Sequence, residues 1–276
     1  MTTLEGHKTV TLSAMAWALA VDKAAHAAPD TSGAYLESAG AATIAALPQE
    51  LREPLERELF AAGITGGNGA LSADWLAVIS QAGAAPITGT VVSRHADTST
   101  HCELNLFHGL GLAVEFSRTV RREPGGGTAV ERVHNSVSVT LFPEENVWAV
   151  VAASLPDLRE LTADGSGAAG LPPADSKRRV PAAALEELDA GAEATVHFAL
   201  TAGRGPEDAR QYQAAHIWIL NDGLHEVKTV PGGAPDDPPG EAVLIRREPG
   251  AIALQLVWDV LGAHEFLSAA TGSEAA

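Results

Sequence analysis

Residues 88–120 read TGTVVSRHADTSTHCELNLFHGLGLAVEFSRTV, in which β-branched and other apolar residues recur in short runs. The runs at 88–94, 101–107 and 112–120 have the composition of strands, and a fourth run follows at 133–142. Glycines lie between the second and third runs and between the third and fourth, where the chain must turn. These residues therefore predict an antiparallel meander of four strands.

Helical patterns lie on both sides of this meander. The spacing of apolar residues predicts one helix that begins near Thr11 or Ser13, a second over 48–62 and a third from Ser72 to Gly83. Pro143 ends the last strand, and the apolar residues behind it predict a helix over 143–155. Helices therefore precede and follow the strands.

A similar succession returns in the second half of the chain. Strands are predicted at 194–201, 216–220, 225–230 and 242–247. A closing helix is predicted at 252–261. We therefore predict a degenerate duplication and an α+β fold, a central antiparallel β-sheet flanked by helices with quasi-twofold character. With helices on one face only, the other face of the sheet would be left for solvent or for a partner.

We expect residues 1–276 to form a single α+β domain. It is expected to begin with a helical region at 10–85, followed by a first copy of strands and helix at 86–160. A flexible linker is expected at 161–180, and the second copy at 181–270. The linker is expected because its Gly, Ala, Ser, Asp and Pro residues offer little to a packed core.

The charge of the chain restricts its partners. Acidic residues outnumber basic ones 35 to 18, and a net charge of −17 opposes binding to nucleic acid or to anionic membranes. Cys102 is the only cysteine, which excludes an intrachain disulfide and fits a reducing compartment. The Ala-rich segment 12–28 contains Asp22 and Lys23, so we interpret it as a helix and not as a signal peptide or membrane span. We therefore expect a cytoplasmic protein without membrane insertion.

The sequence offers no converging catalytic pattern. His95, His101, Cys102 and His108 are close in sequence, but their spacing matches no zinc pattern, so structural or surface roles are preferred. Ser166 lies between glycines in the expected linker, without the strand, turn and helix that a nucleophilic serine requires. We therefore predict a binding protein that is not an enzyme and has no cofactor and no metal.

The tryptophans bear on where a partner could bind. Four of them fall on apolar helix faces and are expected in the core: Trp17, Trp75, Trp148 and Trp258. Trp218 lies in a strand and faces away from its apolar neighbours, so a core role and an interface role are both open for it.

We assign partner binding to two matching hairpins. The candidate contact residues are Leu110, Leu112, Trp218 and Leu224. The loops at 121–131 and 230–240 occupy equivalent places in the two copies, and their glycines and prolines would let them adapt to a partner. The alternative reading is that all four residues are core.

The arrangement resembles the EspG family of proteins associated with actinobacterial ESX, or type VII, secretion. The resemblance is carried by Leu12-Ser13-x-x-x-Trp17, Leu71-Ser72-x-Asp74-Trp75-Leu76, Val137 to Leu155, Asp237-Pro238-Pro239-Gly240-Glu241-Ala242-Val243-Leu244 and Pro249-Gly250. The order of elements is similar over nearly the whole chain. The chain departs from the family pattern in a shorter middle segment and a His-rich second strand.

This resemblance implies a quasi-twofold fold in which two helical bundles flank a central antiparallel sheet. It also implies a cytosolic chaperone that binds the helical tip of a PE/PPE-like secreted substrate and keeps it soluble before export. The alternative is a hydrolase or transferase whose histidine-containing site assembles only in the fold. A cleft that places two of four histidines within hydrogen-bond reach of a carboxylate would favour that alternative, and their dispersal on the surface would rule it out: His101, His108, His134 and His216.

Overall fold

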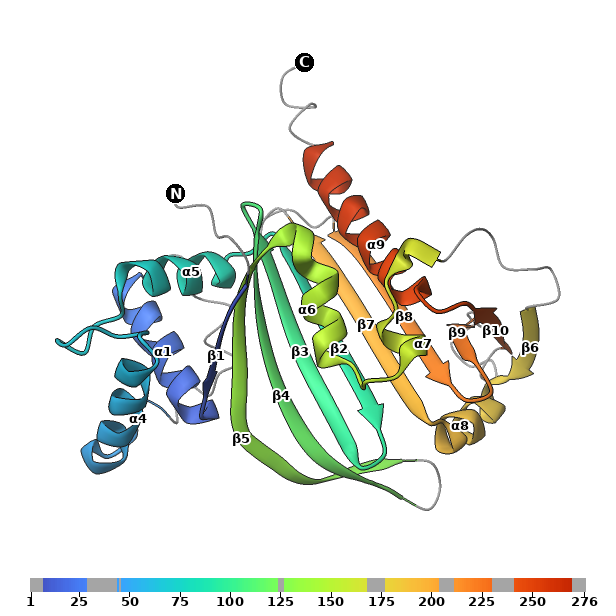
Figure 1. Cartoon of the computed structure of the whole chain (residues 1–276), viewed down its shortest axis with the longest axis horizontal. Helices are drawn as coiled ribbons and strands as arrows, with labels where there is room; N and C mark the ends of the chain where they lie inside the picture. Colours follow the sequence, from blue (N-terminus) through green and yellow to red (C-terminus); the bar gives the residue numbers. More distant parts are fainter. Residues whose placement is uncertain are drawn as a thin grey trace. The chain divides into compact units, whose positions relative to one another are not determined.

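The computed structural model describes residues 7–28, 44, 46–123, 127–167, 177–203, 211–229 and 241–269. The fold is α+β, with a ten-stranded antiparallel sheet flanked by helices (Figure 1). The strands are β1 Lys8–Leu12, β2 Ile87–His95, β3 Thr98–Phe107, β4 Leu110–Arg122, β5 Thr128–Pro143, β6 Lys177–Pro181, β7 Ala194–Gly203, β8 Gln211–Leu220, β9 Leu224–Thr229 and β10 Glu241–Arg247. The predicted fold class is therefore confirmed.

Seven helices and two short 3-10 turns are found among the described residues. They are α1 Ala14–Ala27, α4 Gln49–Ala61, α5 Ala73–Gly83, α6 Val147–Ser154, α7 Arg159–Thr162, α8 Ala182–Gly191 and α9 Ala251–Ser268, with η1 Glu144–Asn146 and η2 Gly165–Gly167. No helix in this part of the chain has both the length and the apolar character needed to span a membrane.

The strands of the sheet follow the order β1-β5-β4-β3-β2-β7-β8-β9-β10-β6. One half of the sheet consists of β2 to β5 in order, with β1 at its outer edge. The other half consists of β7 to β10 in order, with β6 at its outer edge. The four consecutive strands of each half were predicted from the sequence, whereas the edge strands β1 and β6 were not. The duplication itself stays a prediction.

The chain divides into two compact units. Unit 1 comprises Met1–Thr88, Glu103–Phe116 and His134–Val147, and unit 2 comprises Gly89–Cys102, Ser117–Val133 and Trp148–Ala276. Strands β2 to β5 contribute residues to both units. The expected single domain over 1–276 stays a prediction.

The core of unit 1 is built around α1. Ser13 caps this helix, because its side-chain oxygen accepts a hydrogen bond from the backbone N–H of Ala16 at 3.2 Å. The Ser13 hydroxyl in turn donates to Glu58 of α4 at 2.8 Å. Trp17 on α1 and Trp75 on α5 are both buried, as predicted. The cap, the three helices and the indoles thus form one packed cluster.

Residues 8–12 are a strand and not the beginning of the first helix. β1 pairs antiparallel with β5, with Lys8 opposite Leu141 and Leu12 opposite Val137. The partner strand lies far away in sequence, so the local pattern that predicted a helix from Thr11 could not reveal it. Ser13, the other predicted cap, is the one that begins the helix.

The predicted linker over 161–180 is wrong at both of its ends. Leu161 in α7 is 1% exposed, and β6 pairs antiparallel with β10, with Pro181 opposite Glu241. A strand at the edge of a sheet needs few apolar residues, because its ladder hydrogen bonds come from the backbone. The rest of the linker, 168–176, lies outside the described residues.

In unit 2 helices lie on both faces of the sheet, but α8 covers only part of the face opposite α9. Ile219 of β8 packs with Val227 of β9 in a cluster that also contacts Leu185 and Leu188 of α8. His216 of β8 faces the other way and contacts α9. Beyond α8 the expected open face is present, since the paired residues Ala199 of β7 and Ala215 of β8 on that face are exposed.

A glycine in unit 1 lets two parts of the sheet meet closely. Gly111 of β4 faces the ring of Phe142, which is fully buried. A Cβ at position 111 would overlap that ring. The hydrogen side chain of Gly111 is thus required by packing.

We predict that Gly111→Ala lowers the free energy of unfolding by about 1–3 kcal/mol, because the added methyl group overpacks the core. Urea unfolding followed by circular dichroism measures this difference. Gly67→Ala is the matched control, since nothing lies within 4 Å of a Cβ there. Equal stability of the two variants would contradict the close contact with Phe142.

Candidate functional site

The residues predicted to bind a partner are mainly core residues. Leu112, Trp218 and Leu224 are each at most 2% exposed, and Leu110 is half-buried against the core of unit 1. Their burial fits the core role that the sequence also allowed, and it leaves little apolar area for a partner. The predicted loop at 230–240 lies outside the described residues, as do residues 124–126 of the other loop.

Trp218 lies beneath α9. It is opposite Val196 of β7 and Glu226 of β9, and its ring centroid is 6.4 Å from that of His216. Because residues two apart in a strand share a face, Trp218 and His216 both lie on the side that α9 covers. The indole therefore helps to form the floor on which α9 packs.

We predict that Trp218→Ala lowers the free energy of unfolding by roughly 3–5 kcal/mol, the usual cost of removing a large buried aromatic side chain. Chemical denaturation of the purified variant measures this loss. A variant that unfolds at the wild-type denaturant concentration would contradict the core role.

A buried ionic network joins α9 to the sheet of unit 2. His216 of β8 lies 3.0 Å from Asp259 of α9 through Nε2 and 3.5 Å from Glu226 of β9 through Nδ1. Arg247 of β10 donates two hydrogen bonds to Glu226, one of them at 2.9 Å, and Lys228 lies 3.3 Å from the same carboxylate. Glu226 is 1% exposed. Each buried charge thus has a counter-charge, as burial requires.

The network shifts the ionisation of its members. Burial alone would lower the pKa of His216, but the adjacent carboxylates of Asp259 and Glu226 outweigh burial and raise it to about 9. Burial alone would raise the pKa of Glu226, but His216, Arg247 and Lys228 lower it to about 2. At neutral pH the imidazolium of His216 therefore links two carboxylates, one on β9 and one on α9.

We predict that the free energy of unfolding falls as the pH rises from 6.5 to 9. A raised pKa means that the folded state holds a proton that the unfolded state releases above 6.5, so the stabilisation by His216 is complete below 6.5 and is lost toward 9. The expected loss is roughly 3 kcal/mol. Denaturant unfolding at the two pH values measures it.

The control for this prediction is His216→Gln, which keeps a polar side chain but cannot titrate. This variant is expected to be less stable than the wild type near pH 6 and to lose most of the dependence on pH. A slope equal to that of the wild type would show that other groups cause it.

α9 also presents a second apolar face, which points away from the sheet. Val257, Trp258 and Leu261 are 43%, 68% and 50% exposed, and Leu254 beside them is half-buried. The four residues have the spacing i, i+3, i+4 and i+7, which places them on one stripe of a helix. We call them the α9 stripe. The prediction that Trp258 is a core residue is wrong, because its side chain is exposed. Of the other tryptophans predicted on helices, Trp17 and Trp75 are buried and Trp148 is half-buried.

A signal for the α9 stripe is present in the sequence. Apolar residues between 252 and 261 occur at positions all around the helix, whereas a helix that covers one side of a sheet needs only one apolar face. The opposite side of α9 supplies that face, with Ile252, Leu256 and Val260 buried. The residues of the α9 stripe are thus not needed for the packing of α9 on the sheet.

Other exposed apolar residues are more scattered. They are Leu51 and Phe60 on α4 and Val130 and Val133 on β5. Leu51 and Phe60 are nine residues apart, and Val130 and Val133 fall on opposite faces of their strand. Isolated exposed apolar residues of this kind are normal on a protein surface.

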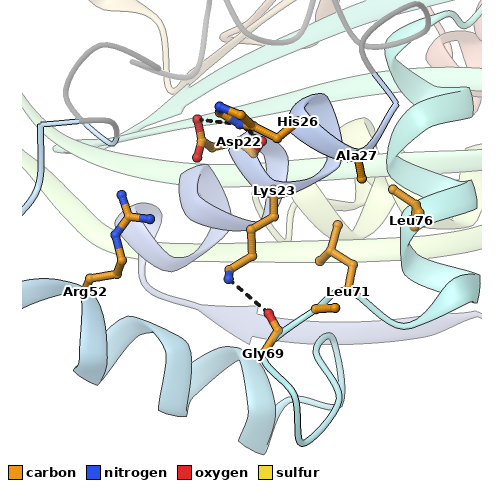
Figure 2. A pocket seen from close by; sticks show the side chains of 9 residues that line it. Asp22, Lys23, His26, Ala27, Arg52, Gly69, Leu71 and Leu76 are labelled. Atoms are coloured by element: carbon orange, nitrogen blue, oxygen red, sulfur yellow. Dashed lines mark hydrogen bonds and ion pairs between the residues drawn. The ribbon is translucent and has the colours of Figure 1, made fainter. Parts of the chain in front are cut away.

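A pocket of about 550 Å³ lies in unit 1 beside α1 and α4 (Figure 2). Lys23 and Arg52 line it, but Lys23 donates to the carbonyl of Gly69 at 3.0 Å and Arg52 donates to that of Ile44 at 3.1 Å. Lys23 also lies 3.5 Å from Glu56. Lys23 and Arg52 are therefore already engaged by backbone carbonyls beside the pocket.

The histidines bear on the alternative enzyme. His216 lies close to two carboxylates, but Arg247 and Lys228 also neutralise this site, and α9 covers it. His108 lies in the β3–β4 turn with φ of +51°. Among the described residues, no group of three or more His, Cys, Asp or Glu is arranged to hold a metal ion. The network around His216 thus has the form of a structural clamp.

Comparison of the sequence with models of known protein families and with curated proteins gives no match.

Proposed function

We propose that this protein is a non-enzymatic, chaperone-like binding protein of a type VII (ESX) secretion system. In this proposal it acts in the cytoplasm and holds an apolar helical tip of a secreted PE/PPE-like substrate. The resemblance to the EspG family suggests the system and the substrate. The observation that carries the binding role is the α9 stripe.

The spacing of the α9 stripe favours a helical partner. Helices pack by inserting side chains of one helix between rows at i, i+3, i+4 and i+7 of the other. Trp258 is 68% exposed, and a tryptophan is among the residues that contribute most when an interface forms around it. A partner helix laid along α9 would cover Trp258 together with Val257 and Leu261.

The buried ionic network fixes the helix that carries the α9 stripe. His216 and Asp259 hold α9 on β8, and Asp259 follows Trp258 directly in sequence. Fixing Asp259 inward orients the neighbouring indole outward. A surface whose helix is already in place loses less conformational entropy on binding.

We predict that Trp258→Ala weakens binding of the secreted partner by about 2 kcal/mol, roughly thirtyfold in Kd, because it removes the largest side chain of the stripe. Unfolding of the free variant should change by no more than about 0.5 kcal/mol, since the side chain is exposed. Co-expression with a PE/PPE-like protein, followed by co-purification and calorimetry, measures both effects.

The matched control is Phe60→Ala, which removes another exposed aromatic side chain, on α4 in unit 1. It should leave binding unchanged. Failure of the wild-type protein to retain any PE/PPE-like substrate in soluble form would refute the proposed function. An equal loss with both variants would refute the assignment to α9.

A further inference from the structure

The α9 stripe has acidic residues at both of its ends. Glu265 is exposed on α9, one turn beyond Leu261, and Glu248 is exposed just before Gly250, where the helix begins. Asp164 is exposed as well, and its backbone carbonyl lies against Gly250. We call Asp164, Glu248 and Glu265 the acidic rim.

The segment that carries Asp164 is fixed against α9. Gly165 of η2 packs on the side chain of Leu254, so closely that a Cβ at 165 would lie 2.7 Å from it. Ser166 donates hydrogen bonds to the Asp164 carboxylate from its hydroxyl at 2.5 Å and from its backbone at 3.2 Å. These bonds lower the pKa of Asp164, so the carboxylate beside the stripe stays charged.

The basic groups nearest to the start of α9 are already in use. Arg247 is bound to Glu226, and Arg246 donates to the carbonyl of Asp222 at 3.3 Å. His216 is enclosed between Glu226 and Asp259 beneath the helix. His264, on α9 itself, is exposed, and a single histidine does not balance three carboxylates. The three carboxylates of the acidic rim thus outnumber the one histidine that α9 itself carries.

This charge argues against a second copy of the chain as the occupant. Two copies would bring a net charge of −17 each together, and α9 against α9 would place two acidic rims around one small apolar contact. A helix that carries lysine or arginine beside its apolar residues would instead meet opposite charge at both ends of the stripe.

We propose that the partner of the α9 stripe is an amphipathic helix whose apolar face is bordered by basic residues. The stripe contacts the apolar face, and the acidic rim pairs with the basic border. This inference rests on the proposed function for its surface, and it adds the charge that selects the partner.

Two designed helical peptides test the proposal on the full-length protein. Both carry the same leucines at i, i+3, i+4 and i+7, and the flanking positions are lysine in one peptide and glutamate in the other. Fluorescence anisotropy of labelled peptides gives Kd at low and at physiological salt. We expect the basic peptide to bind at least tenfold more tightly than the acidic one, with a difference that shrinks as salt rises.

Two triple variants separate the rim from the overall charge. Asp164→Asn, Glu248→Gln and Glu265→Gln together should weaken the basic peptide roughly tenfold. The control neutralises three exposed acidic residues of unit 1, Glu50→Gln, Glu53→Gln and Asp74→Asn, and changes the net charge by the same amount. It should change Kd by less than about twofold. Trp258→Ala should weaken both peptides.

Equal affinity for the two peptides, or an equal loss with the two triple variants, would overturn the proposal. These results test the inference about charge separately from the proposed function. Binding of the basic peptide without any secreted substrate would refute only the secretion role. Binding of a secreted substrate along α9 with no preference for basic peptides would refute only the inference about charge.

Discussion

The contact between His216 and Asp259 is the interaction on which the binding surface depends. It joins β8 to α9 across 3.0 Å, in a position where each partner would be costly to bury alone. Glu226 extends the contact to β9, and Arg247 extends it to β10. The helix is thus fixed in rotation as well as in position, because Asp259 can face inward in only one orientation of α9.

Much of the fold could be predicted from the sequence because its causes are local. Ser72 caps α5 as expected, since the cap and the acidic first turn are adjacent in sequence. Pro143 marks the passage from β5 into η1 and α6 for the same reason. The edge strands were not predicted because β1 and β6 are defined by partners sixty or more residues away, and neither has a distinctive composition.

The candidate site was harder to predict than the fold. Trp218 and Trp258 both lie in segments rich in apolar residues, yet one forms the floor beneath α9 and the other lies on its outer side. Periodicity tells which residues share a face of an element, but not which face another element covers. The ionic network was missed because its members come from three strands and a helix, and only the three-dimensional arrangement brings them together.

The edge strand β6 has a consequence for how the protein behaves at high concentration. Lys177, Arg178 and Arg179 are exposed along this last strand of the sheet, where unpaired backbone groups could accept a strand from another molecule. Stacking of two such edges would bring Lys177 and Arg178 of both molecules together, while Arg179 of each is paired with Glu241 of β10 at 3.0 Å. Repulsion between these positive charges thus opposes end-to-end polymerisation of the sheet through β6. The acidic residues elsewhere in the chain do not lie along this strand and cannot provide that repulsion.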